Sequence, residues 1–575
     1  MRNFKEEYQR WLDSPALSEQ EWEELNGIAN DEKEIESRFF APLEFGTAGL
    51  RGTMKVGLHH MNVHVIRWAT QAFANVIVAE GQEAMDKGIV IAHDCRLNGV
   101  EFSQEAACVM AANGIKVRIF DALRPTPELS FAVRYYGTTA GLNITASHNP
   151  KEYNGYKVYW SDGAQLPPQH AEAIAAQMDA IDIFTGFKTC DYEQAVKAGK
   201  IQVIGEETDE AFLKEVMAQA IDLDAVKAAA DDLKIVYTPF HGCGYKLVPE
   251  ALRRLGIKHL YPVPEQMVID GNFPTVESPN PENPEGFYLA VDLAKEVGSD
   301  LIIGTDPDSD RIGTMVRDGD NYVTITGNQM GVLLLDYIIK ARKSTGTMPA
   351  NPGAVSSIVS TSMARTVAEA NGVHFEDTFT GFKFMAERIA SWEAAGSYSY
   401  IFAFEESYGY MLGDYVRDKD AVTASMLVAE MAAHYQQKGM TLLDAINALY
   451  EQYGWFQEKT VNLVMPGLDG LQKMKALMDS LRSDPPEEIG GVEVIRLRDY
   501  LDGSIAVKGL GKVDKTPFAG SNVLYFELAD GSSYIVRPSG TEPKIKVYLL
   551  VRGKSREDCQ TKADKYREFT EALGK

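Results

Sequence analysis

The chain has 575 residues, of which 45% are hydrophobic and 24% charged, as in an ordinary globular protein, and its length predicts roughly four domains. A formal net charge of −25 argues against nucleic acid as the main partner, because binding a phosphate backbone requires a basic surface. No stretch approaches the ~20 apolar residues of a membrane span, and the N-terminus lacks the apolar segment of a secretory signal.

The first third alternates helical and short apolar segments. Residues 1–31 are charged and helix-prone, with Trp11, Trp22 and Leu25 as expected packing residues. The spacing of apolar residues predicts an amphipathic helix at 63–79 and another helix at 102–113. The expected strands are 88–92, 115–120, 140–146 and 155–160.

The same alternation restarts twice. A strand at 233–238 and a helix at 248–255 begin the second unit, and a Pro/Asn/Glu-rich loop at 262–284 follows, either as a linker or as a functional loop. The expected elements of the third unit are a strand at 354–359, a helix at 362–370, a strand at 399–404 and a closing helix at 421–437. Strands at 525–528, 533–536 and 545–551, with a last helix, predict a different C-terminal domain.

The expected fold is therefore α/β, with three similar mixed α/β domains and a smaller C-terminal α+β domain. The predicted domains are residues 1–205, 206–322, 323–450 and 451–575.

Ser147 follows a strand-like run and precedes a turn of His, Asn and Pro. A hydroxyl at the tip of such a rigid strand–loop–strand unit can be presented to a substrate. The alternative is that Ser147 and Asn149 merely form the turn.

Asp306, Asp308 and Asp310 alternate in a loop just after the apolar run 301–304. Carboxylates at alternate positions can converge on one hard cation and leave positions open for phosphate oxygen, which suits Mg²⁺. An EF-hand is rejected, because Arg311 and Arg317 occupy the positions where that loop requires Gly and Glu. A solvated acidic turn is the alternative.

Two further loops and several basic residues have the right chemistry for a sugar phosphate. The segment 537–544 begins with Arg537 and offers hydroxyls and glycine-exposed amides as an anion cradle, although a generic turn is also compatible. Glu405 and Glu406 beside Ser407 suit sugar hydroxyls, but this signal is weak alone. The basic residues beside these loops, which predict a local anion-attracting region, are Arg51, Lys157, Lys383, Arg417 and Lys419.

In this order, the segments 145–150, 306–311, 405–407 and 537–541 resemble the four signature loops of the α-D-phosphohexomutases. The segment 43–52 and the helical N-terminal extension resemble the longer members of that family. The resemblance implies four domains around a central cleft, each contributing one loop.

The resemblance also implies roles. Ser147 would carry a phosphoryl group, and Asp306, Asp308, Asp310 and a phosphoserine oxygen would hold Mg²⁺. Arg51, His148 and Lys157 match the active-site basic residues to which proton transfer is assigned. The residues expected to bind substrate are Glu405, Ser407, Lys383, Arg417, Lys419, Arg311, Arg537, Ser539, Gly540 and Thr541. Some relatives have a histidine two residues after Ser407, where this chain has Gly409, which leaves Lys157 as the better candidate for proton transfer.

The implied activity is the interconversion of α-D-glucose 1-phosphate and D-glucose 6-phosphate, with glucose 1,6-bisphosphate as intermediate and activator. Pentose or mannose phosphates are alternative substrates, and a Mg²⁺-dependent sugar-phosphate phosphatase is the alternative from another class. We expect a small sugar phosphate as partner, no nucleic acid or membrane, and a monomer or homodimer. Five scattered cysteines without zinc or redox spacing predict reduced thiols and a cytoplasmic location.

Overall fold

The structure is a computed structural model, and it describes residues 3–47, 49–465, 470–539 and 544–574. The chain divides into two compact units. Unit 1 comprises Met1–Thr326, Tyr400–Ala403 and Ser407–Thr441, and unit 2 comprises Gly327–Ser399, Phe404–Glu406 and Leu442–Lys575. Both units therefore contain segments that are far apart in the sequence.

Three short helices precede the first sheet of unit 1. They are α1 (Phe4–Leu12), α2 (Glu19–Gly27) and α3 (Glu32–Phe39). Trp11 and Leu25 are fully buried, as the sequence predicts, and the Trp11 ring packs edge-on against Phe39 with centroids 5.7 Å apart. The prediction that Trp22 packs inside is wrong, because α2 leaves this side chain 45% exposed.

A six-stranded sheet forms the first α/β domain, in the order β1-β5-β4-β2-β3-β6. The four strands β4, β2, β3 and β6 are parallel, whereas β5 is antiparallel to both β4 and β1. The strands are β1 (Leu50–Thr53), β2 (Ile89–His93), β3 (Val117–Phe120), β4 (Ala140–Ile144), β5 (Tyr153–Trp160) and β6 (Ile201–Ile204). The helices are α4 (Val63–Ala79), α5 (Gln82–Lys87), α6 (Gly99–Ala112), α7 (Thr126–Tyr136), α8 (Pro168–Ala180) and α9 (Tyr192–Lys197).

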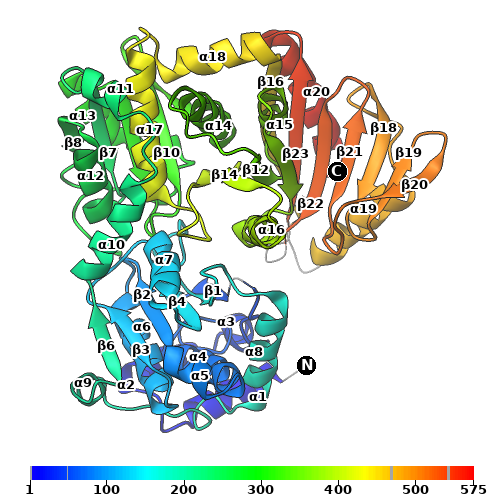
Figure 1. The fold of residues 1–575 in the computed structure, drawn as a ribbon. Helices are drawn as coiled ribbons and strands as arrows, with labels where there is room; N and C mark the ends of the chain where they lie inside the picture. Colours follow the sequence, from blue (N-terminus) through cyan, green and yellow to red (C-terminus); the bar gives the residue numbers. More distant parts are fainter. Residues whose placement is uncertain (1–2, 48, 466–469, 540–543, 575) are drawn as a thin grey trace. The chain divides into compact units, whose positions relative to one another are not determined.

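The central strands of this sheet are buried on both faces. In β2, Ile89 and Ile91 belong to the core formed with α4 and α6, whereas Val90 and Ala92 belong to a second core formed with α7. Figure 1 shows α4 and α7 on opposite sides of β2 and β4. Burial of both faces explains why these strands are continuous apolar runs in the sequence and lack polar alternation.

A five-stranded sheet forms the second α/β domain, in the order β11-β10-β9-β7-β8. The strands β8, β7 and β9 are parallel, and β10 and β11 extend the sheet as an antiparallel hairpin. The strands are β7 (Lys234–Thr238), β8 (His259–Pro262), β9 (Leu301–Thr305), β10 (Ile312–Asp318) and β11 (Asn321–Ile325). The helices are α10 (Glu206–Met217), α11 (Leu223–Ala229), α12 (Gly244–Leu255), η1 (Pro284–Phe287) and α13 (Tyr288–Val297).

Helix α17 (Ala421–Gln436) returns to this second domain from a distant part of the chain. Its side chains pack against α11 and α12, and nearly all of its residues are buried. The sequence pattern predicts instead that this helix closes the third α/β unit. Periodicity identifies a buried helix but does not show which sheet it covers. The predicted helix is therefore confirmed, but its assignment to the third unit is wrong.

Unit 2 begins with the long buried helix α14 and the third α/β domain. Its sheet has the order β13-β12-β14-β15, with β12 and β13 parallel; β14 contributes residues to both units, and the residues of β15 belong to unit 1. The strands are β12 (Pro352–Ser357), β13 (His374–Thr378), β14 (Ser399–Glu405) and β15 (Gly409–Met411). The helices are α14 (Gly327–Ser344), α15 (Met363–Ala370), α16 (Phe382–Ala395) and α18 (Leu442–Tyr453).

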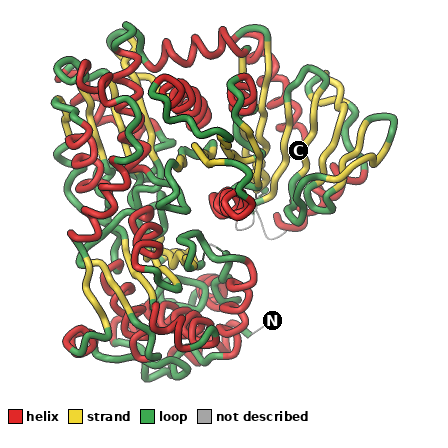
Figure 2. The backbone as a smooth tube through the Cα atoms, in the orientation of Figure 1, coloured by secondary structure: helices red, strands yellow, loops and turns green. Residues whose placement is uncertain are grey.

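The C-terminal part of unit 2 is an antiparallel sheet in the order β16-β23-β22-β21-β18-β19-β20, with β17 paired to β18. Figure 2, in which strands are yellow, shows how rich in strand this part is. The strands are β16 (Trp455–Val464), β17 (Glu488–Ile489), β18 (Val492–Asp499), β19 (Ser504–Val507), β20 (Gly511–Lys515), β21 (Leu524–Leu528), β22 (Ser533–Pro538) and β23 (Lys544–Gly553). The helices are α19 (Gly470–Ser483) and α20 (Arg556–Leu573), and Ser555 caps α20 by accepting a hydrogen bond from the Asp558 amide.

The predicted fold class is confirmed: three mixed α/β domains precede a β-rich C-terminal domain. Within the described part of the chain, no helix is both long and apolar enough to cross a membrane. The domain boundaries and the central cleft implied by the sequence stay predictions.

The contrast between Trp11 and Trp22 gives a test of the N-terminal packing. Trp11→Ala should remove about 3–5 kcal/mol of stability, because it leaves a cavity in a buried site. Trp22→Ala should cost less than about 1 kcal/mol, because nearly half of that side chain is exposed. Thermal unfolding followed by calorimetry measures both variants, and equal losses would contradict this packing.

Candidate active site

Ser147 lies in the loop that joins the antiparallel strands β4 and β5, and its side chain is buried. Its backbone is left-handed, with φ +52°, which costs a non-glycine residue roughly 1–2 kcal/mol. The Ser147 amide donates to Thr145 Oγ1 at 2.8 Å, and that hydroxyl donates to Asp94 Oδ2 at 2.6 Å. The serine hydroxyl is therefore presented by a strained turn held by buried polar contacts.

Asp306, Asp308 and Asp310 lie in the loop that follows β9, and their carboxylates are buried close together. These residues are at most 1% exposed, and one oxygen from each lies within 4.8 Å of the others. Asp306 Oδ1 accepts hydrogen bonds from the amides of Asp310 at 3.0 Å and Arg311 at 2.9 Å. Asp308 Oδ1 and Asp310 Oδ1 are buried without a hydrogen-bond partner among the described residues.

This carboxylate triad has the donor set that a hard cation requires. Burial, together with repulsion from Asp308 and Asp310, raises the pKa of the Asp306 carboxyl well above its ordinary value. Two unpartnered carboxylate oxygens and a destabilised third carboxylate are the features that a bound cation would relieve. The residues present therefore fit a divalent metal ion.

The serine loop meets the triad directly. Ser147 Oγ donates to Asp306 Oδ2 at 3.1 Å, although the two residues are 159 positions apart in the sequence. His148 Nδ1 lies 3.2 Å from the same serine hydroxyl. Desolvation and the nearby Arg311 and Arg51 guanidinium groups hold the pKa of His148 well below its ordinary value, so its imidazole is neutral.

Two lysines neutralise part of the triad. Lys157 Nζ lies 3.1 Å from Asp310 and 3.6 Å from Asp418, and Lys419 Nζ lies 3.1 Å from Asp310 and 3.2 Å from Asp418. Burial alone would lower the pKa of Lys157, but Asp418, Asp310 and Asp308 outweigh it and raise that pKa. Lys157 is therefore a cation, which favours it as a charge or proton donor over a base.

Arg51, Arg311 and Arg417 engage nearby groups. Arg51 is exposed, and its Nη1 donates to Asn149 Oδ1 at 3.1 Å. Arg311 Nη1 donates to Glu282 Oε1 at 2.6 Å. The buried Arg417 donates from Nη1 to the carbonyl of Asp414 at 2.7 Å, and its amide donates to Ser130 Oγ at 2.9 Å. In this structure all three have protein partners within unit 1.

Among the residues that hold this site, the sequence analysis missed Thr126 and Asp418. Thr126, at the start of α7, donates from its amide to the Asp308 carbonyl at 2.8 Å and from Oγ1 to Asp308 Oδ2 at 2.7 Å. Asp418 accepts hydrogen bonds from Tyr159 at 2.9 Å and Gln165 at 3.0 Å, and it lies between the two lysines. The alternating charges of residues 417–420 are a local pattern that could have indicated Asp418 as a site residue. The sequence around Thr126 contains no comparable pattern.

Glu405, Lys383, Arg537 and Ser539 belong to unit 2. The Glu405 carboxylate accepts a hydrogen bond from the Gly381 amide, which places the loop before α16 beside it. Glu406 Oε2 instead accepts from Ser357 Oγ at 3.2 Å and Ser360 Oγ at 3.4 Å. Both glutamates therefore contact the third domain, and Glu405 borders the start of α16, which carries Lys383.

The predicted phosphate loop joins β22 to β23. Arg537 pairs with Lys546 across these strands, and the Ser539 amide donates to the Lys544 carbonyl at 2.8 Å. Gly540 and Thr541 lie outside the described residues. Ser407, the remaining predicted substrate ligand, is half-buried in unit 1, and the carbonyl of the next residue, Tyr408, accepts a hydrogen bond from the Ile312 amide at 3.1 Å.

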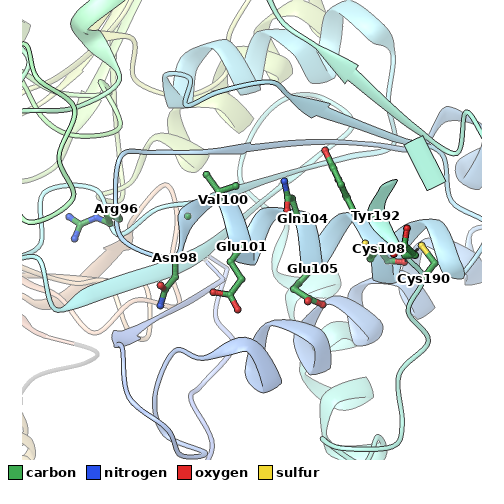
Figure 3. Close-up of a pocket in the computed structure, with 11 residues that line it drawn as sticks. Arg96, Asn98, Val100, Glu101, Gln104, Glu105, Cys108, Cys190 and Tyr192 are labelled. Atoms are coloured by element: carbon green, nitrogen blue, oxygen red, sulfur yellow. Dashed lines mark hydrogen bonds between the residues drawn. The ribbon is translucent and has the colours of Figure 1, made fainter. Parts of the chain in front are cut away.

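A separate cavity of about 590 Å³ lies beside α6 and contains none of the predicted site residues. Its lining includes Glu101, Glu105, Cys108 and Cys190 (Figure 3). All five cysteines are free, and Cys190 Sγ donates to the Cys108 carbonyl at 3.4 Å. The acidic lining makes this cavity unsuitable for a phosphate.

Comparison with known proteins identifies the same architecture. Three family models match this chain, all described as phosphoglucomutase/phosphomannomutase alpha/beta/alpha domains: domain I at residues 42–183, domain II at 210–319 and domain III at 326–453. The phosphoglucomutase of Staphylococcus saprophyticus is 35% identical over 90% of this chain and 92% of its own length. The phosphoglucomutase of Staphylococcus aureus strain MRSA252 is 36% identical over 91% of this chain and 92% of its own length.

Solved structures agree on the fold. The phosphoglucomutase of Paramecium (pp63/parafusin), in its open form, gives a TM-score of 0.67 at 19% identity, over 92% of this chain and 95% of its own. A phosphoglucomutase/phosphomannomutase family protein from Burkholderia thailandensis gives a TM-score of 0.65 at 19% identity, over 92% of this chain and 97% of its own. Three matched domains in order and relatives of similar length show that the chain belongs to the phosphoglucomutase/phosphomannomutase family of the α-D-phosphohexomutase superfamily.

Proposed function

We propose that this chain is a phosphoglucomutase, an isomerase that interconverts α-D-glucose 1-phosphate and D-glucose 6-phosphate. The observation that carries the proposal is the Ser147 hydroxyl, 3.1 Å from Asp306 in the buried carboxylate triad. A hydroxyl beside a cation site can carry a phosphoryl group, because the cation neutralises the charge on its oxygens. The activity of the Staphylococcus relatives, both named phosphoglucomutase, supports the same assignment.

The proposed metal is Mg²⁺. Asp306, Asp308, Asp310 and an oxygen of phosphorylated Ser147 would hold it, since oxygen ligands with open positions suit this ion. Bound there, Mg²⁺ would supply positive charge to the transferring phosphoryl group.

In the proposed reaction, the P–O bond at Ser147 Oγ breaks while a P–O bond forms to the free hydroxyl of the sugar phosphate. The product of this step is glucose 1,6-bisphosphate. The proton of the sugar hydroxyl ends on Ser147 Oγ, where His148 Nδ1, 3.2 Å away, is placed to transfer it. When the bisphosphate returns its other phosphate to Ser147, the same proton is removed and transferred to the sugar oxygen that is released.

The remaining site residues are proposed to hold the substrate. Glu405 and Ser407 would bind the sugar hydroxyls, and positive charge on Arg51, Lys157 and Lys419 would attract the phosphates. The residues proposed to bind the phosphates are Lys383, Arg311, Arg417, Arg537, Ser539, Gly540 and Thr541. Arg311 and Arg417 would have to exchange their protein partners for phosphate oxygens.

Further proposals rest on the sequence. The enzyme would work in the cytoplasm with reduced cysteines, as a monomer or homodimer, with glucose 1,6-bisphosphate as activator. The four domain ranges 1–205, 206–322, 323–450 and 451–575 are retained as proposed boundaries.

A coupled assay distinguishes a mutase from the alternatives. Turnover of glucose 1-phosphate should exceed that of mannose 1-phosphate and ribose 1-phosphate, and it should depend on catalytic glucose 1,6-bisphosphate. A mutase needs the bisphosphate to keep its serine phosphorylated, whereas a phosphatase does not. Release of inorganic phosphate without isomerisation would identify a phosphatase, and a preference for mannose or ribose would move the enzyme to another branch.

Ser147→Ala should lower kcat by more than about 1,000-fold, because the phosphoryl carrier is lost. Ser103→Ala is the matched control, because Ser103 is a buried serine of the same domain whose hydroxyl donates to the Val100 carbonyl at 2.9 Å. Both variants should keep the wild-type far-ultraviolet circular dichroism spectrum. Wild-type turnover in Ser147→Ala would disprove the carrier role.

Mg²⁺ should raise the melting temperature of the wild-type protein, because a ligand that binds only the folded state stabilises it. Asp308→Asn should remove most of this shift, whereas Asp209→Asn, which changes a buried carboxylate outside the triad, should keep it. Chelation should also stop turnover. An equal shift in all three proteins would exclude the triad as the metal site.

A further inference from the structure

Arg96 makes an unusual set of contacts with the serine loop. Its Nη2 donates to the carbonyls of Ser147 at 2.6 Å and Asn149 at 2.5 Å. Its Nη1 donates to the carbonyls of Pro150 at 2.8 Å and Tyr153 at 2.9 Å. The side chain has no exposed surface. One guanidinium group thus fixes four carbonyls along the loop that carries Ser147.

Asp94 connects the same arginine to the other side of Ser147. Asp94 Oδ2 lies 3.2 Å from Arg96 Nε and accepts a hydrogen bond from Thr145 Oγ1 at 2.6 Å. The Thr145 hydroxyl in turn accepts the Ser147 amide at 2.8 Å. A single buried ion pair therefore controls both the N–H and the C=O of a residue whose φ is +52°.

The segment 263–283 of the second domain covers this arrangement. The Arg96 guanidinium lies over the Phe273 ring, 5.3 Å from its centroid, and Figure 3 shows it directed away from the cysteines of the cavity beside α6. A Cβ at Gly271 would lie 2.6 Å from the Leu97 amide and 2.7 Å from the Cys95 carbonyl, so only glycine allows this approach. The segment therefore packs closely against Arg96 and its neighbours, so it is a functional loop and not only a linker.

The donors of Arg96 exclude a direct role in substrate binding. A guanidinium group has five N–H donors. Four are directed at carbonyls of the serine loop, and the fifth, on Nε, faces Asp94. The Nε–H makes no hydrogen bond among the described residues, but the whole side chain is buried, so it cannot reach a phosphate unless the loop itself is released.

We propose that Arg96 is a positioning residue: it holds Ser147 in the left-handed conformation that directs its hydroxyl at Asp306, and Phe273 holds Arg96. This inference rests on the proposed function, because a misplaced carrier matters only if Ser147 carries the phosphoryl group. Loss of the clamp should slow phosphoryl transfer and leave substrate affinity intact, since no substrate contact is removed.

Arg96→Lys is the decisive variant, because it keeps the charge and loses the fork that reaches several carbonyls. We expect kcat to fall about 100-fold, the effect of a misplacement near 1 Å, while KM stays within about threefold. Arg38→Lys is the matched control: Arg38 is a buried arginine of unit 1 that bonds Glu24, Glu34 and the Val56 carbonyl. It should lose comparable thermal stability and keep the wild-type kcat.

Thr145→Val is the second variant and keeps the shape of the side chain while removing both hydrogen bonds. It should lower kcat about tenfold with KM unchanged, and it decides the question if Arg96→Lys does not fold. Wild-type kcat in the folded variants, or an equal loss of kcat in Arg38→Lys, would overturn the positioning role while the mutase assignment stands. Absence of bisphosphate-dependent turnover in the wild-type protein would overturn both.

Discussion

Buried negative charge is the constraint on which unit 1 depends. Asp306, Asp308, Asp310 and Asp418 are all at most 1% exposed, and Lys157 and Lys419 form ion pairs with Asp310 and Asp418. The Arg311 guanidinium also acts on Asp306 and Asp310, yet Asp308 Oδ1 and Asp310 Oδ1 are buried without a hydrogen-bond partner among the described residues. An uncompensated buried charge is far more costly than an exposed one, so the site favours a divalent cation.

The same charges explain why distant segments meet. Lys157 comes from β5 of the first domain, the triad from the loop after β9 of the second, and Lys419 from the turn before α17. Each segment alone would bury an unpaired charge. Their association in unit 1 is therefore favoured by electrostatics as well as by apolar packing, and it gathers positive charge locally within an acidic protein.

The sequence predicted the elements and motifs that short-range patterns encode. It missed the residues whose role depends on partners far away in the chain. The apolar runs of β2, β4 and β9 and the alternate aspartates of 306–310 are short-range patterns, so their elements and the metal-binding chemistry could be read from the chain. Arg96 and Thr126 act through partners 51 and 182 positions away, and neither stands in a recognisable motif. Helix α6 begins at Gly99, three residues before the predicted start, and its N-cap Asn98 makes no side-chain capping hydrogen bond that would mark this start.

Backbone strain gathers at the same centre. The described non-glycine residues with positive φ are Asn98, Ser147, Phe240, His241, Phe273, Ser309 and Tyr408. Of these, Ser147, Phe273, Ser309 and Tyr408 belong to segments that contact the serine or aspartate loop. Such conformations cost roughly 1–3 kcal/mol each and persist only where surrounding contacts determine them. Here those contacts are hydrogen bonds between loops, such as Ile312 to the Tyr408 carbonyl at 3.1 Å. A substitution that relaxed one loop would therefore gain stability locally and lose the geometry that aligns the serine with the carboxylates.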